Sequence, residues 1–221
     1  MKRAREKGIL DLSIRNLRDW AADRHRTVDD TPYGGGAGMV MTAPVLAAAV
    51  EAVRGEGSRV VLLSPQGRPL DHAAAERLSR ETHLVLVSGH YEGIDERARL
   101  LLVDEEISVG DFVVSNGSLA AMLLIDAVVR LIPGAVGDAR SVREDSFCGG
   151  VLDYPHYTKP RSFRGLEVPA VLLEGDHEKI RRWRRREALR RTLERRPDLL
   201  GRAPLTGEDR SLLAELRGGL T

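Results

Sequence analysis

The sequence predicts an α/β protein with a parallel sheet, followed by a small, basic and mostly helical domain. Two observations indicate the sheet. Runs of branched apolar residues at 60–63 and 83–87 are typical of strands buried on both faces, and they alternate with stretches of helical periodicity. A third observation indicates the second domain, because residues 179–196 contain ten basic and two acidic residues.

The composition excludes several classes of protein. Of 221 residues, 42% are hydrophobic and 30% are charged, as in ordinary globular proteins. A single cysteine excludes a disulfide scaffold. No apolar run reaches 18 residues and the start shows no signal-peptide pattern. We therefore expect a soluble, cytoplasmic protein with no membrane association.

The remaining elements of the first domain follow from periodicity. A helix with apolar residues on several faces should lie in a core or an interface, and this description fits residues 119–132. Pro133 and Gly134 then break the pattern. The other expected elements are helices over 43–53 and 71–81 and a strand over 107–115, within a domain spanning 1–134.

A flexible linker is predicted for residues 135–150, which show little apolar periodicity and several glycines and charges. The second domain, 151–221, should begin with a proline-bracketed aromatic segment over 154–160. Its expected elements are a strand over 168–173, a basic helix over 177–195 ended by Pro197, and a helix over 206–217 with a capping-box-like start.

Arginine outnumbers lysine 30 to 4. A GC-rich genome explains such a ratio, and so does a need for arginine's fit to phosphate, so the ratio alone decides nothing. The clustering within 179–196 is different, because a genome-wide bias does not select one segment. It predicts contact with phosphate groups.

Glycines follow all three expected strands, at Gly67, Gly89 and Gly117. One glycine of this kind is typical of a plain turn. Ligands of open α/β sheets bind beyond the carboxyl ends of strands, so the recurrence predicts one small molecule held by backbone hydrogen bonds. A further glycine-rich segment, 29–39, matches neither the dinucleotide fingerprint nor the P-loop, and both a functional loop and a flexible connection remain open for it.

Nucleophile motifs are absent from the sequence. Cys148 has no evident histidine partner, and the histidines show no metal-ligand spacing. We therefore expect no covalent catalysis and no histidine metal site, and the sequence leaves a metal-ion requirement open.

Seven segments with long, specific motifs run in order through nearly the whole chain: 17–39, 63–67, 89–97, 106–115, 144–147, 152–158 and 180–184. Together they resemble the bacterial tRNA (guanine-N1)-methyltransferases of the TrmD type, in the knotted SPOUT superfamily. Two departures stand out. The family's N-terminal strand is missing before residues 3–8, and Asn116 and Ser118 replace a family glycine and glutamate; asparagine tolerates the left-handed conformation that glycine adopts.

The resemblance implies a SPOUT domain with a C-terminal trefoil knot that holds S-adenosylmethionine. It also implies methylation of N1 of the guanine immediately 3′ of the tRNA anticodon. The family acts as a homodimer whose active site is shared between subunits, which suits the apolar helix expected over 119–132.

The resemblance also assigns site residues. Arg130 and Asp145 fall on the family's catalytic arginine and aspartate. A carboxylate can accept the N1 proton, and an arginine can stabilise the charge that builds on the neighbouring carbonyl oxygen. The cofactor loops fall on Leu62, Leu63, Ser64, Pro65 and Gly67, on Gly89, Tyr91 and Glu92, and on Val109, Gly110, Asp111, Phe112, Val113, Val114, Asn116 and Gly117. RNA contacts are expected at Asp30, Gly34, Gly35, Arg181, Arg182, Arg184 and Arg185.

Two other functions stay open at this point. The chain could be a non-catalytic RNA-binding protein that holds no cofactor, or a knotted methyltransferase that acts on ribosomal RNA. Binding of S-adenosylmethionine distinguishes the first, and guanine-dependent methylation of tRNA distinguishes the second.

Overall fold

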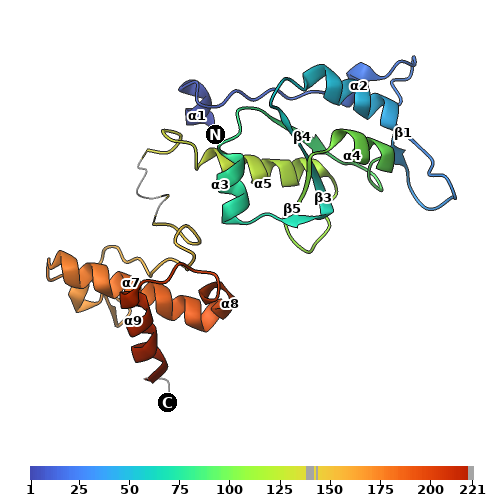
Figure 1. Ribbon diagram of the computed structural model, residues 1–221. Helices are drawn as coiled ribbons and strands as arrows, with labels where there is room; N and C mark the ends of the chain where they lie inside the picture. Colours follow the sequence, from blue (N-terminus) through green and yellow to red (C-terminus); the bar gives the residue numbers. More distant parts are fainter. Residues whose placement is uncertain (138–141, 143, 219–221) are drawn as a thin grey trace. The chain divides into compact units, whose positions relative to one another are not determined.

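The computed structural model describes residues 1–137, 142 and 144–218, and the chain divides into two compact units, Met1–Gly137 and Asp138–Thr221 (Figure 1). The first unit is built on a parallel sheet with the strand order β4-β3-β5. Its strands are β3 (Arg59–Pro69), β4 (Leu84–Ser88) and β5 (Glu105–Ser108). The predicted α/β class with a parallel sheet is confirmed.

Helices cover both faces of this sheet (Figure 1). Because side chains alternate along a strand, Val61 and Leu63 of β3 enter one apolar cluster while Val60 and Leu62 enter the other. The first cluster is completed by α3 (His72–Leu78) and α5 (Gly117–Val129), and the second by α2 (Ala43–Val53) and α4 (Glu96–Leu102). This two-sided burial explains the continuous apolar run in the sequence.

Short elements complete the first unit. They are α1 (Lys2–Glu6), the 3₁₀ helix η1 (Leu17–Trp20), and the strands β1 (Asp29–Asp30) and β2 (Val40–Met41), which pair antiparallel. Ala4 of α1 packs with Val129 and Ala135, so the N-terminal helix covers the end of α5.

The second unit is a small helical assembly. Its elements are the hairpin β6 (Ser162–Phe163) and β7 (Leu166–Glu167), the 3₁₀ helix η2 (Ala170–Leu172), and helices α7 (His177–Arg195), α8 (Pro197–Leu200) and α9 (Gly207–Gly218). Leu189 of α7 and Leu212 of α9 form the centre of its core, together with Val151. The carboxylate of Asp176 accepts hydrogen bonds from the first free N–H groups of α7 and so fixes its start.

Two predicted strands differ from the structure. The strand expected over 168–173 is wrong, because Pro169 cannot donate to a ladder and η2 follows it directly. The third strand ends at Ser108 instead of 115. The Ser108 hydroxyl donates to the carbonyl of Gly110 at 3.0 Å, and Gly110 has a φ of 149°, so the chain turns out of the sheet there.

The predicted linker, 135–150, is divided between the units wherever the structure describes it. Ala135 is buried in the first unit, and residues 144–150 are folded within the second, whereas 138–141 and 143 lie outside the described residues. Within the described ranges, no helix is both long enough and apolar enough to cross a membrane.

Candidate functional site

The carboxyl half of β3 contains a bulge that lies on β5. Pairing of the two strands is interrupted between Leu63 and Arg68, and the four residues between them leave the sheet at the carboxyl edge of the strands. A Cβ on Gly67 would overlap the backbone of Glu106 and Ile107. Glycine is therefore required at position 67 for this bulge to lie on β5.

The end of β4 supports the start of α5. The backbone N–H of Gly117 donates to the carbonyl of Gly89 at 2.8 Å, and a Cβ on Gly117 would lie 2.8 Å from the nitrogen of Gly89. The side chain of Asn116 caps the helix by accepting from the N–H of Ser118. Asn116 is extended, with a φ of −160°, so its replacement of a family glycine requires no left-handed conformation.

Gly89 itself has open space around it. A Cβ built on Gly89 would meet no heavy atom within 4 Å, and no positive φ requires glycine there. Close packing of the backbone explains why glycine occurs at positions 67 and 117, but it does not explain the glycine at position 89. The open space lies at the carboxyl end of β4, where ligands of open α/β sheets bind.

The glycine-rich segment forms the loop between β1 and β2, and its base is tied to the loop after β4. The N–H of Glu92 donates to the carbonyl of Met39 at 3.0 Å, and the Glu92 side chain packs against Gly38. Gly34 and Gly35 have positive φ angles, and Tyr33 beside them is fully exposed. The structure thus brings the expected RNA loop next to an expected cofactor loop.

The other expected cofactor residues fall into two groups. The side chains of Leu62 and Leu63 are buried in the two cores, and Val109 packs against one of them, so these residues can offer a ligand only backbone groups. The exposed or half-buried residues around the strand ends are Ser64, Pro65, Tyr91, Asp111, Phe112, Val113 and Val114.

The two expected catalytic residues lie in different units. Arg130 follows the last turn of α5 in the first unit, where it is exposed. Asp145 is half-buried in the second unit, and its carboxylate accepts a hydrogen bond from the N–H of Ser146 at 2.9 Å.

The turn that carries Asp145 is anchored to α7. The N–H of Leu152 donates to the hydroxyl of Thr192, which is fully buried and itself donates to the carbonyl of Ala188. Gly150 packs so closely on residues 203–204 that a Cβ would lie 2.9 Å from the Cα of Ala203. The basic helix therefore helps to position the carboxylate, a role that its charge pattern gives no sign of.

The expected phosphate-binding arginines of α7 have acidic neighbours on α9. Arg181 contacts Glu208 at 2.9 Å and Arg182 contacts Glu215 at 3.3 Å, both in exposed pairs. Arg185 contacts Asp209 at 2.6 Å, and Asp209 is 1% exposed. Hydrogen bonds from Arg185 lower the pKa of Asp209 to about 2, against the effect of its burial.

Arg184 differs from these three. Its guanidinium lies over the ring of Tyr154, 5.0 Å from the centroid. Arg184 lines a pocket together with Trp183 and Arg161, two residues that are absent from the expected RNA contacts. A tryptophan within an arginine-rich helix, three residues after Ile180, was the available signal.

The first unit is an α/β domain with glycine-bearing loops around its strand ends, and the second is a helical domain with a basic helix, α7. No group of three or more potential metal ligands occurs among the residues that the structure describes. A family model described as tRNA (Guanine-1)-methyltransferase TrmD matches residues 1–202. The chain belongs to this family, which confirms the resemblance.

Individual relatives agree with the family model. The chain is 57% identical over 224 residues to a tRNA (guanine-N(1)-)-methyltransferase of Pelotomaculum thermopropionicum, which covers 100% of this chain and 89% of the relative. It is 57% identical to a protein of the same name from Moorella thermoacetica, over 98% of this chain and 88% of the relative. It is 53% identical to a protein of the same name from Geobacter metallireducens, over 99% of this chain and 90% of the relative.

Proposed function

We propose that this protein transfers a methyl group from S-adenosylmethionine to N1 of the guanine immediately 3′ of the anticodon in tRNA. Membership of the methyltransferase family supports the reaction and the tRNA substrate. The observation that carries the proposal is the open space at Gly89, bounded by the start of α5. Since tRNA is the substrate, we place the protein in the cytoplasm.

The residues at the strand ends fit a cofactor of this kind. The loops at Ser64–Pro65, Gly89–Glu92 and Val109–Gly117 offer backbone N–H and C=O groups together with the apolar side chains of Phe112 and Val113, both exposed. A nucleoside needs such a combination of apolar walls and fixed polar groups. When bound, S-adenosylmethionine supplies the methyl group. We further propose that these segments form a trefoil knot, and the close packing of the β3 bulge on the backbone of β5 supports this.

Asp145 and Arg130 carry the proton chemistry in this proposal. The carboxylate of Asp145 accepts the proton that leaves guanine N1. The guanidinium of Arg130 stabilises the negative charge that develops on the adjacent carbonyl oxygen. Neither role needs a covalent intermediate with the protein.

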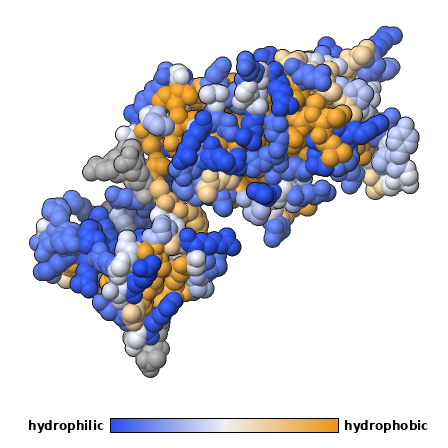
Figure 2. Space-filling view, viewed as in Figure 1, coloured by the Kyte–Doolittle hydropathy of each residue, from blue (hydrophilic) through white to orange (hydrophobic). Residues whose placement is uncertain are grey.

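We propose that the protein acts as a homodimer with an active site shared between subunits. Leu119, Met122 and Leu123 of α5 are all about half-exposed. On α4, Leu100 and Leu101 are exposed as well, and hydrophobic residues gather there in Figure 2. Because α4 and α5 cover opposite faces of the sheet, these are two separate groups of exposed apolar residues, and each is a candidate interaction surface.

The arginines of α7 provide a prediction about tRNA binding. We expect a double variant, Arg181→Ala with Arg182→Ala, to bind tRNA more weakly and with a flatter salt dependence. The slope of log K against log[salt] should fall by about 0.7 to 0.9 for each phosphate that the variant no longer neutralises. Both ion pairs are exposed, so their removal should cost little stability. Fluorescence anisotropy with labelled tRNA at several salt concentrations measures the slope.

Cofactor binding is the control for this double variant, because both residues lie in the second unit. A slope equal to that of the parent protein would assign Arg181 and Arg182 to ion pairs within the second unit, with Glu178, Glu208 and Glu215. Arg185 is unsuitable for the test, since its removal leaves the buried Asp209 without its partner.

Two measurements test the proposed function. Titration calorimetry should show binding of S-adenosylmethionine, and its absence would leave a non-catalytic RNA-binding protein. Methyl transfer should then occur to a tRNA transcript with guanine 3′ of the anticodon and not to the same transcript with adenine there. Equal methylation of both transcripts, or of ribosomal RNA instead, would contradict the proposal.

A further inference from the structure

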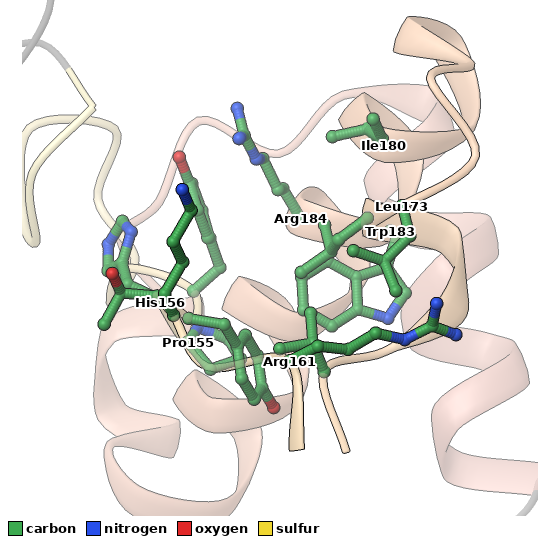
Figure 3. A pocket seen from close by; sticks show the side chains of 13 residues that line it. Pro155, His156, Arg161, Leu173, Ile180, Trp183 and Arg184 are labelled. Carbon is green, nitrogen blue, oxygen red and sulfur yellow. The ribbon is translucent and has the colours of Figure 1, made fainter. Parts of the chain in front are cut away.

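The second unit contains a pocket of about 530 Å³ formed by residues 154–161, η2 and α7 (Figure 3). Its volume lies within the range of small-molecule sites. Every residue that lines it belongs to the second unit, whereas the strand-end loops belong to the first. The proposed methyl transfer at those loops leaves this pocket without a role.

Aromatic side chains form one wall of the pocket. Trp183 and Tyr157 have ring centroids 6.3 Å apart, and Tyr157 is 49% exposed. Figure 3 shows Trp183 on the pocket wall, between Arg184 and Arg161. Trp183 takes no part in the buried core around Leu189. The packing of this core therefore does not account for a large aromatic residue there.

The charged residues that line the pocket are all basic. Arg184, Arg161 and Lys159 line it, and no lining residue in the described part of the chain carries a carboxylate. Three acids lie nearby: Asp153 contacts His156 at 2.7 Å, Glu167 is 4.0 Å from Arg161, and Glu144 interacts electrostatically with Tyr154. Arg184 keeps its position over the ring of Tyr154. The pocket therefore suits a ligand with a flat apolar face and a negative charge.

We propose that this pocket binds one unpaired nucleotide of RNA, with its base stacked on Trp183 and its phosphate held by Arg184. Unstacked bases of RNA loops are recognised by aromatic side chains and by arginine, and base–aromatic stacking tolerates any base. A base within a duplex is already stacked and paired, so it cannot enter. The proposal rests on the proposed function in one respect, that tRNA is the natural source of the nucleotide.

Tryptophan fluorescence can report on the pocket, because Trp20 and Trp183 are the only tryptophans of the sequence. A Trp20→Phe variant of the full chain leaves Trp183 as the single tryptophan fluorophore. We expect saturable quenching when this variant is titrated with an RNA hairpin that has a loop of about seven single-stranded nucleotides. A blunt RNA duplex of the same stem sequence should give little quenching at equal phosphate concentration. Equal quenching by the duplex, or by polyglutamate, would overturn the proposal.

Affinity for the same hairpin gives an independent test. Trp183→Ala should weaken binding by about 10- to 100-fold, the range for loss of one stacked base, and Trp183→Phe should restore most of it. Phe163→Ala is the matched control, since Phe163 is an exposed aromatic residue of the same unit that does not line the pocket. Equal affinities of Trp183→Ala and the parent protein would overturn the proposal.

The outcomes of these experiments test the nucleotide pocket and the proposed function separately. Methylation of tRNA by the parent protein without quenching of Trp183 would overturn the nucleotide pocket alone. Quenching and stacking-dependent affinity without methyl transfer would support the pocket and contradict the proposed function.

Discussion

An Asp145→Asn variant is expected to transfer methyl groups about 10²–10⁴-fold more slowly than the parent protein, the range for loss of a general base. The amide cannot accept the N1 proton. It can still accept the hydrogen bond that the N–H of Ser146 donates to Asp145 at 2.9 Å, so the turn should keep its shape. Binding of S-adenosylmethionine and tRNA should change little. Single-turnover rates at saturating substrate measure the chemical step separately from binding and release.

Glu144 supplies the matched control for Asp145. It is the same kind of acid one position earlier, but it is exposed where Asp145 is half-buried. Glu144→Gln should slow methyl transfer far less. If both variants react at the parent rate, Asp145 is an ordinary loop acid and another group takes the proton.

A Gly89→Leu variant is expected to fold normally and to lose detectable binding of S-adenosylmethionine. The fold should tolerate the change because a Cβ on Gly89 meets nothing within 4 Å, and glycine is not required there by a positive φ. The isobutyl group would fill the open space at the end of β4, where the cofactor must approach the backbone. Titration calorimetry measures the binding, and thermal unfolding verifies the fold.

Variants of two further glycines distinguish a loss of binding caused by a filled site from one caused by a damaged fold. Gly117→Ala should lower the unfolding temperature, since its Cβ would lie 2.8 Å from the backbone nitrogen of Gly89. Gly55→Ala should affect neither property, because its Cβ would meet only the Ser58 hydroxyl, at 3.7 Å. Cofactor affinity of Gly89→Leu equal to that of the parent protein would show that the β4 loop does not hold the cofactor.

The parts of the fold that could be predicted correctly are those with strong local signals. The branched apolar run at 60–63 became the centre of β3, because a strand buried on both faces needs apolar residues at every position. Helix α7 runs over the predicted 177–195, since Asp176 caps its start and Pro197 follows its end. Gly89 follows the end of β4 as predicted, whereas Gly67 lies within β3 and Gly117 begins α5.

The parts that could not be predicted depend on distant partners. The apolar run over 168–173 reads as a strand, but among the described residues no strand of the second unit pairs with it. The arginines of α7 read alike in sequence, and only the position of α9 separates Arg185, paired with Asp209, from Arg184, which faces Tyr154. The support that Thr192 gives to the Asp145 turn comes from a hydrogen bond between residues 40 positions apart, and no local pattern encodes it.

The contact between Gly117 and Gly89 couples the start of α5 to the loop after β4. The first turn of α5 includes Leu119, which is exposed, and its backbone is hydrogen-bonded to Gly89. A ligand that fixes Gly89 therefore also fixes the helix turn that a second subunit would contact. In the proposed homodimer, the factor by which cofactor changes self-association must equal the factor by which self-association changes cofactor binding. We therefore expect dilution of the proposed homodimer into single subunits to change cofactor affinity by that factor.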